Sequence, residues 1–298
     1  MLTGILLLDK PLGLSSNGAL QRVKRLLRAE KAGHVGSLDP LATGMLPICL
    51  GEATKIAGDI LSGRKRYLFT IALGNRTATG DLEGAIVETL PMPPFDRATL
   101  DAMLGRFLGK QMQVPPMYSA IKRDGQPLYK LARAGIEVER PAREIEVFGF
   151  EVRAFDAASA QLEVSCSKGT YVRTLAEDIA RALGTCGHVS LLRRLHVEPF
   201  EEEPMVTLEA VTAAAEGGQL PCLLDADKGV PQLPEVHLSA PAVHRVTHGQ
   251  AAAIAAEIAP GRVRLYDEHG RFFGIGEADG FGTVQPRRLF VQSTGKNG

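Results

Sequence analysis

The chain has 298 residues, of which 45% are hydrophobic and 23% charged, as is typical of a soluble globular protein with one large or two ordinary domains. No apolar run approaches the ~18–20 residues of a membrane-spanning helix, and the start lacks the basic leader of a signal peptide, so we expect a cytoplasmic protein. The four cysteines form no Cys-x-x-Cys pair, which argues against a zinc ribbon or a disulfide framework.

The net charge is zero, but the charged residues are distributed unevenly. Residues 1–80 contain eleven Lys/Arg and five Asp/Glu, whereas residues 198–227 contain eight acidic residues and no base. A basic face favours a polyanionic partner, although ordinary solvated surface is the common alternative for any one cluster.

The first third of the chain alternates short apolar runs with amphipathic segments, and Gly or Pro marks most boundaries. A capping residue for the first helix is available at Ser15, Ser16 or Asn17. In chain order, the patterns predict a strand over 4–9, a helix over 16–28, a loop over 33–51, a short helix over 52–61, a strand over 67–73, a turn-rich stretch over 75–84, a strand over 86–90 and a helix over 97–108.

The remainder contains one long irregular segment and a change of pattern near residue 235. Residues 114–141 are polar and broken by Pro and Gly, so they could form a mobile lobe over a site. Thr174 and Glu177 have capping-box spacing. Further predictions are strands over 144–155 and 161–166, a helix over 174–183, an acidic helix-like piece and linker over 198–234, and a small β-rich domain with strands over 262–266, 272–277 and 283–291.

One acidic residue, Asp39, stands alone in the uncharged stretch 35–51, where glycines and Pro40 bracket it. A lone carboxylate in a Gly-rich turn against apolar residues suits covalent or acid–base chemistry. The ordinary interpretation is a capping Asp before proline. Taken alone, Asp39 is better explained as a capping residue. The catalytic interpretation therefore depends on the other unusual segments.

Three further segments have compositions that suit RNA. Residues 64–67 (RKRY) place Tyr67 beside three basic residues, where the aromatic ring could stack on an unstacked nucleobase. The alternative is an edge strand whose basic side chains are solvated. Residues 115–135 contain two tyrosines and four Lys/Arg against one Asp, or are a solvated loop. Residues 77–81 (TATGD) form a polar turn, for which an ordinary turn is the alternative.

Arg173 comes just before a predicted helix, where the helix dipole disfavours a cation. A buried carboxylate would justify this placement, because Arg pairs with carboxylates bidentately. Asp39 is the first candidate, with Glu177 or Asp178 as the alternative partner.

Together these segments resemble the bacterial tRNA pseudouridine-55 synthases, the TruB family. Residues 4–17 (GILLLDKPLGLSSN) resemble the opening motif of the family and residues 33–55 its catalytic motif. The similarity is strong over residues 1–230, while the C-terminal residues resemble a small RNA-binding PUA-like barrel more weakly. The later motifs follow in family order as KRYLFTIALG (65–74), TATGDLEG (77–84), QVPPMYSAIKRDGQPLYKLARAG (113–135), CSKGTYVRTLAEDIARALG (166–184) and LLRRL (191–195).

The resemblance implies an α+β fold with a mixed, largely antiparallel central sheet and flanking helices. It implies a catalytic domain over 1–234 with an RNA-binding lobe over about 112–141, and a PUA-like β-barrel over 235–298. The implied activity is isomerisation of uridine to pseudouridine at position 55 in the tRNA T loop, by base flipping, without cofactor or metal. The expected partner is the tRNA T stem-loop, and the expected state is a cytoplasmic monomer.

The resemblance also implies roles for individual residues. Asp39 would be the nucleophile, paired with Arg173, and Tyr67 would stack on the target base. His34 would sit where a T-loop base is displaced. Whether Asp39 attacks base or sugar, or first removes a sugar proton, stays open. The substrate-binding set is completed by Tyr171, Leu192, Lys10, Arg66 and Asp81, with Lys10 interpreted as support for the active-site loop.

Two positions depart from the family pattern: Val35 replaces the usual Thr, and Glu198 precedes the Pro-Phe ending of the last strand. Three other functions compete with the synthase reading. A non-catalytic RNA-binding or chaperone protein would not need Asp39, and a guide-RNA-dependent synthase would not need the long lobe. A metal-dependent hydrolase would need ligand spacing, which only His244 and His248 offer.

Overall fold

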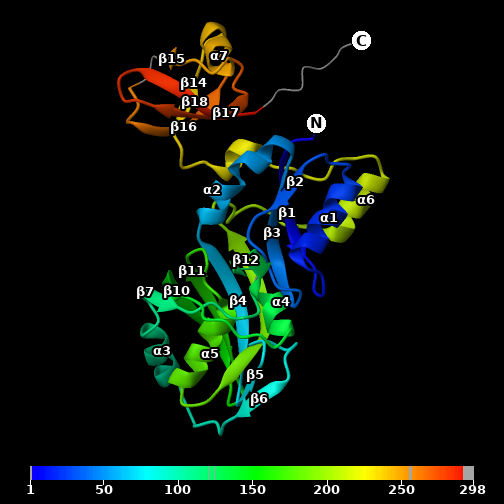
Figure 1. The fold of residues 1–298 in the computed structure, drawn as a ribbon, viewed down its shortest axis with the longest axis vertical. Helices are drawn as coiled ribbons and strands as arrows, with labels where there is room; N and C mark the ends of the chain where they lie inside the picture. Colours follow the sequence, from blue (N-terminus) through cyan, green and yellow to red (C-terminus); the bar gives the residue numbers. More distant parts are fainter. Residues whose placement is uncertain (1, 120, 124, 255–256, 291–298) are drawn as a thin grey trace.

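A computed structural model of the protein describes residues 2–119, 121–123, 125–254 and 257–290 (Figure 1). In these ranges the chain builds one large sheet with helices against it and a separate small sheet near the C-terminus. No helix in the described ranges is long and apolar enough to cross a membrane.

The large sheet has nine strands within the described residues, in the order β13-β1-β3-β12-β4-β11-β10-β7, with β2 paired to β3. The pairs β1–β13 and β3–β12 are parallel, and the other pairs are antiparallel. The strands are β1 (Gly4–Lys10), β2 (Ala32–His34), β3 (Ala42–Leu50), β4 (Lys65–Leu73), β7 (Gly109–Gln113), β10 (Arg143–Phe155), β11 (Ser159–Cys166), β12 (Gly187–Val197) and β13 (Val206–Thr207).

Helices cover both faces of this sheet, because successive strand residues point to opposite faces and many strands are apolar on both. In β1, Leu6 and Leu8 face one apolar cluster, and Ile5 and Leu7 face another. The helices are α1 (Ser16–Leu26), η1 (Gly51–Ile56), α2 (Ala57–Ser62), α3 (Arg97–Gly105), α4 (Leu128–Arg133), α5 (Val172–Ala182), α6 (Leu208–Glu216) and η2 (Ala226–Gly229).

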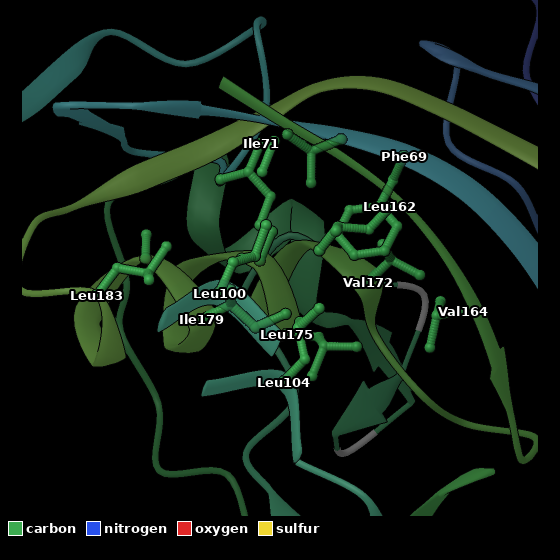
Figure 2. Close-up of a cluster of buried hydrophobic side chains, with 14 of the residues drawn as sticks. Phe69, Ile71, Leu100, Leu104, Leu162, Val164, Val172, Leu175, Ile179 and Leu183 are labelled. Carbon is green, nitrogen blue, oxygen red and sulfur yellow. The ribbon is translucent and has the colours of Figure 1, made fainter. Parts of the chain in front are cut away.

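The largest apolar cluster supports the middle of the sheet (Figure 2). Phe69 and Ile71 of β4 pack against Leu175 and Ile179 of α5, and all four are at most 1% exposed. Each fully buried side chain of this size contributes about 1.5–3 kcal/mol relative to exposure. The cluster therefore fixes the first turn of α5 against β4, and both elements contribute to the site described below.

The C-terminal sheet has the strand order β14-β16-β17-β18-β15 and curls into a half-barrel. Helix α7 (Ala240–Thr247) packs against it. Ile275 of β17 is fully buried in a cluster shared with η1 and α2, and Arg262 pairs with Asp59 of α2. The strands are β14 (Glu235–His237), β15 (Ala252–Ala253), β16 (Gly261–Tyr266), β17 (Phe272–Ala278) and β18 (Thr283–Leu289).

Two small hairpins complete the chain: β5 (Asn75–Thr77) with β6 (Ile86–Thr89), and β8 (Lys122–Arg123) with β9 (Gln126–Pro127). The strand predicted over 86–90 is confirmed as β6, whereas β5, β8 and β9 lie in stretches predicted to be turn-rich or irregular.

The predicted α+β class with a mixed, largely antiparallel sheet is confirmed. Three local predictions are wrong. The loop predicted over 33–51 contains β3, which is buried on both faces and so lacks strand alternation. Helix α5 begins at Val172, so Thr174 lies inside the helix and forms no capping box, and Arg173 lies in its first turn. The strand predicted over 283–291 ends at Leu289, and Val291 lies outside the described residues.

Candidate active site

Asp39 lies in the turn that joins β2 to β3, residues 35–41, here called the Asp39 loop. The opening motif holds this loop. Ser16 Oγ accepts a hydrogen bond from Leu38 N at 2.7 Å and donates to Leu38 O at 3.0 Å. Gly13 N donates to Pro40 O at 2.8 Å. Residues 13–16 and the Asp39 loop therefore form one hydrogen-bonded unit, although 22 residues separate Ser16 from Leu38.

Lys10 also holds this hydrogen-bonded unit, through its side-chain ammonium group. Its side chain is fully buried, and Nζ donates to the carbonyl oxygens of Pro11 and Leu14 at 2.9 and 2.6 Å, and to that of Pro40 at 3.4 Å. Burial lowers the pKa of Lys10 to about 8, and the nearby Asp39 carboxylate partly opposes this. Lys10 does not line the cavity described below.

Arg173 reaches the Asp39 carboxylate from the first turn of α5, and Arg173 Nε lies 3.0 Å from Asp39 Oδ2. Its other nitrogens are also engaged: Nη1 donates to Thr79 O at 2.8 Å, and Nη2 donates to Tyr118 O at 2.6 Å. Asp81 Oδ2 lies 3.7 Å from Nη1. Four chain segments therefore meet at one guanidinium whose side chain is only 6% exposed.

The electrostatics of Asp39 are a balance of opposing effects. Burial raises the pKa of Asp39 above its usual value and is the largest influence. The Arg173 guanidinium acts against this, and the Asp81 carboxylate adds to it. The Asp39 side chain nevertheless remains 42% exposed, so one face of the carboxylate is open. A carboxylate fixed on one side and open on the other can attack or deprotonate a bound molecule.

The open side of Asp39 faces a cavity of about 350 Å³, within the ~300–1,000 Å³ typical of small-ligand sites. Tyr67 of β4 and Leu192 of β12 form part of its wall, and Tyr171 stands at the start of α5. Lys65, Lys168, Arg173 and Arg194 also line it, so four cationic side chains accompany the single carboxylate Asp39 among the lining residues.

Strand register explains why these side chains converge. Tyr67 is the direct cross-strand partner of Arg194, and Leu192 is that of Phe69, so all four side chains share one face of the sheet. Gly44 of β3 lies beside Arg194 with φ +99°, and a Cβ there would lie 2.1 Å from Arg194 O. A glycine at position 44 is therefore required for β3 to approach β12 this closely.

Besides Lys10, three predicted site residues lie outside the cavity. Arg66 is on the opposite sheet face from Tyr67, where it pairs with Glu163 and lies 3.8 Å from Glu151. Asp81 is 6% exposed behind Arg173, where it accepts a hydrogen bond from Thr79 Oγ1 at 2.5 Å. His34 ends β2, and its buried Nδ1 has no hydrogen-bond partner among the described residues.

The irregular segment over 114–141 borders the cavity through Ser119 and Ile121. Its base is tied to α5, because the Gln113 amide donates to Tyr171 O at 3.1 Å and accepts from Tyr171 N at 2.8 Å. These bonds satisfy a helix start that no side chain of α5 caps. Farther out, Lys122 and Lys130 are solvent-exposed.

The remaining sequence alternatives can now be compared with the geometry. Among the described residues, the Asp39 side chain forms no capping hydrogen bond, and Arg173 pairs with Asp39, not Glu177 or Asp178. Val35 is 2% exposed in an apolar cluster, which accommodates the departure from Thr. No cluster of three His, Cys, Asp or Glu with metal-binding geometry occurs in the ranges that the structure describes.

Sequence reasoning quoted Arg194 within LLRRL but assigned it no role. The available signal is the pair Arg193-Arg194 in a strand. Since neighbours in a strand face opposite sides, one of two adjacent arginines must point into the protein. Arg194 does so and is 1% exposed, whereas Arg193 forms a bidentate pair with Asp9 at 2.8 and 2.9 Å.

Three family models match successive segments of the chain. Residues 24–172 match the family model described as TruB family pseudouridylate synthase, N-terminal domain. Residues 173–225 match the tRNA pseudouridylate synthase B C-terminal domain, and residues 234–290 match pseudouridine synthase II TruB, C-terminal.

Individual relatives are similar over nearly their full lengths. The chain is 49% identical over 297 residues to a tRNA pseudouridine synthase B of Sodalis glossinidius, covering 97% of this chain and 95% of the relative. It is 50% identical over 294 residues to one of Pseudomonas putida, with the same coverage.

Among solved structures, the chain resembles an H/ACA RNP bound to a substrate RNA containing 2′-deoxyuridine (TM-score 0.73, 25% identity, 97% of this chain and 85% of that one). It also resembles a Cbf5-Nop10-Gar1 complex (TM-score 0.72, 26% identity, the same coverage). On the family match and the full-length relatives, the chain belongs to the TruB family of pseudouridylate synthases.

Proposed function

We propose that this protein isomerises uridine to pseudouridine at position 55 in the T loop of tRNA. One observation carries the proposal: the half-open Asp39 carboxylate, paired with Arg173 at 3.0 Å, faces a ligand-sized cavity in a TruB family chain. Substrate and product are isomers, so the reaction balances without oxidant, reductant or cofactor.

Asp39 is the nucleophile in this proposal and must be ionised to act. Arg173 opposes the rise in the pKa of Asp39 that burial causes, and so favours the reactive form near neutral pH. The nitrogen donors of Arg173 are already fixed by Thr79, Tyr118 and Asp39, so the Arg173–Asp39 pair needs little reorganisation during the reaction.

The target uridine enters the cavity flipped out of the T loop, because the glycosidic bond cannot be reached in a stacked base, and unstacking costs a few kcal/mol. Tyr67 stacks on the flipped base, and Tyr171 and Leu192 enclose it. His34, at the end of β2, contacts the RNA where the base leaves the loop. Lys10 and Asp81 act indirectly, by holding the Asp39 loop and Arg173. Arg66 has no substrate contact in this proposal, since it lies on the opposite sheet face.

We further propose a division of labour along the chain. Residues 1–234 form the catalytic domain, residues 112–141 form a lobe that contacts the T stem-loop, and residues 235–298 form a PUA-like RNA-binding domain. The exposed basic side chains of the lobe would contact RNA phosphates, so the affinity for RNA would fall as the salt concentration rises. The protein would act as a monomer in the cytoplasm, where tRNA is modified.

The competing function is the guide-RNA-dependent synthase already considered from the sequence, and the chain also resembles a protein of an H/ACA RNP in structure. The chain is about twice as identical to the relatives named tRNA pseudouridine synthase B, and it covers 95% of their length. These observations favour an enzyme that selects tRNA without a guide.

Mapping pseudouridine on an unmodified tRNA transcript tests the proposal. Purified protein, with no guide RNA, nucleotide or metal added, should convert the uridine at position 55. A transcript with cytidine at that position is the matched control and should gain no pseudouridine in the T loop. Absence of product on the uridine transcript, or modification only after a guide RNA is added, would refute the proposal.

A further inference from the structure

Arg194 is a buried guanidinium on the wall of the cavity. Its side chain is 1% exposed, its Nε donates to Met45 O at 2.7 Å, and its Nη2 donates to Gly36 O at 3.0 Å and to Val35 O at 3.4 Å. Within the described ranges, no carboxylate forms an ion pair with it.

A buried cation without a counter-charge is costly, because carbonyl dipoles replace only part of its lost hydration. The other cations of the cavity are committed elsewhere. Arg173 pairs with Asp39, and Lys65 Nζ donates to Leu61 O and to Gly63 O at 2.6 Å. Lys168 Nζ lies on the exposed side and donates to Ser62 Oγ at 3.1 Å. Arg194 and Lys65 are therefore the two buried cavity cations without a paired carboxylate in the described ranges, and Arg194 is the one that is the cross-strand partner of Tyr67.

Arg194 also lies beside the residue that would hold the base. Tyr67 and Arg194 are direct cross-strand partners on one face of the sheet, and the Arg194 guanidinium lowers the pKa of Tyr67 against the larger, opposite effect of burial. Gly36 contributes to this packing, because a Cβ there would lie 3.2 Å from Nη1. The positive charge is thus held between the Asp39 loop and Tyr67, beside the space for the base and away from the open rim.

The isomerisation creates negative charge at this place. When the N1–C1′ bond breaks, its electron pair stays with the base, which becomes an anion delocalised over N1, O2 and O4. The sugar is satisfied by a bond from C1′ to Asp39 or by loss of its C2′ proton to Asp39. The base then turns and C5 bonds to C1′ as the C1′–Asp39 bond breaks or, on the other route, as Asp39 returns the proton to C2′. The C5 proton is lost and N1 gains one, so the product is an isomer of the substrate.

We propose that Arg194 is a further catalytic residue of this reaction, one that stabilises the negative charge of the uracil base while it is detached from the sugar. This role rests on the proposed function. Fixed positive charge aimed at developing negative charge in a dry site is an effective form of catalysis, and removal of one such donor costs about 10²–10³-fold in rate.

The test compares two substrates in single-turnover reactions at saturating RNA: a T stem-loop with uridine at the target position and one with 5-fluorouridine. Because 5-fluorouridine has no C5 proton to lose and cannot become pseudouridine, the rate measured on both substrates is the disappearance of the N1-linked nucleoside. Fluorine withdraws electrons from the ring, so the detached base carries its negative charge more easily and needs less help. Arg194→Met should slow the uridine reaction about 100-fold, with a clearly smaller loss on 5-fluorouridine. Arg194→Lys, which keeps the charge, should lie between wild type and Arg194→Met.

Arg193→Met is the matched control, since it removes the neighbouring arginine from the opposite face of β12. It should slow both substrates equally or not at all. Circular dichroism and thermal melting establish that each variant is folded. If Arg194→Met does not fold, the ratio of the two substrate rates in Arg194→Lys decides the question in the same way.

Equal losses on the two substrates would overturn the proposal and leave Arg194 as a clamp on the Asp39 loop, because a displaced Asp39 slows both reactions alike. An unchanged uridine rate in a folded Arg194→Met protein would also overturn it. Failure of the proposed function is a separate outcome, since the wild-type protein would then form no pseudouridine from uridine.

Discussion

The cavity wall and the lobe over 112–141 handle charge in opposite ways. In the wall, Arg194 is 1% exposed and the Arg173 side chain is 6% exposed, and each has named hydrogen-bond acceptors. In the lobe, Lys122 and Lys130 are exposed, and neither pairs with an acidic side chain among the described residues. Fixed buried charges suit bond-making, whereas exposed charges suit long-range attraction of a polyanion.

This contrast separates two kinds of mutational effect. Changes in the wall should alter the rate of the chemical step with little change in RNA affinity. Changes in the lobe should alter affinity and its salt dependence with little change in the rate on bound RNA.

Replacing Asp39 with Asn should have the largest effect, because an amide neither attacks carbon nor accepts a proton as a carboxylate does. Single-turnover pseudouridine formation should fall by about 10⁴-fold or more. Affinity for the T stem-loop, measured by filter binding, should change less than about threefold, because most contacts that bind the RNA do not involve the nucleophile. Substantial activity in this variant would remove Asp39 from the mechanism.

Arg173→Lys should be the next most damaging change. Lysine keeps the positive charge but cannot hold Asp39, Thr79 O and Tyr118 O in three directions at once. The resulting misplacement of Asp39 should cost about 100-fold in single-turnover rate. Arg181→Lys, in the last turn of the same helix, is the control. If both variants react at the same rate, the geometry of Arg173 is irrelevant to the reaction.

The pH dependence should respond to Asp81. Burial raises the pKa of Asp39, and the Asp81 carboxylate raises it further. Because Asp39 must be ionised, activity is lost as the pH falls through that pKa. Asp81→Asn removes the negative charge, so the acid limb of the single-turnover rate, scaled to its own plateau, should move to lower pH. Asp178→Asn, an exposed change on α5, should leave the limb in place. A shift to higher pH in Asp81→Asn would contradict this account.

The fold class and the Asp39–Arg173 pair could be anticipated from the sequence. Other features could not, for physical reasons. Amphipathic helices such as α1 can be identified from the 3.6-residue period of their apolar residues. Strand β3 is buried on both faces, so its sequence lacks alternation and resembles an apolar loop. Arg66 and Tyr67 are neighbours in the same motif, but strand alternation sends them to opposite faces.

Arg194 shows a different limit. Its importance depends on β12 pairing with both β3 and β4, which are far away in the sequence. Nothing local to LLRRL reveals that one of its arginines contacts Tyr67 and the Asp39 loop. Long-range strand order, not composition, places that charge in the cavity.

The smallest expected effect is in the lobe. Lys122→Ala with Lys130→Ala removes two exposed cations, and each lost phosphate contact lowers the slope of log affinity against log salt by about 0.7–0.9. The double variant should therefore bind the T stem-loop more weakly at low salt, with a slope reduced by about 1–2, while the rate at saturating RNA changes little. Lys228→Ala, an exposed lysine next to the acidic stretch 198–227, is the matched control and should leave the slope unchanged. An unchanged slope in the double variant would place the phosphate contacts elsewhere, and a large loss of rate at saturation would mean that the lobe also shapes the cavity, through the ties of Gln113 and Tyr118 to the start of α5.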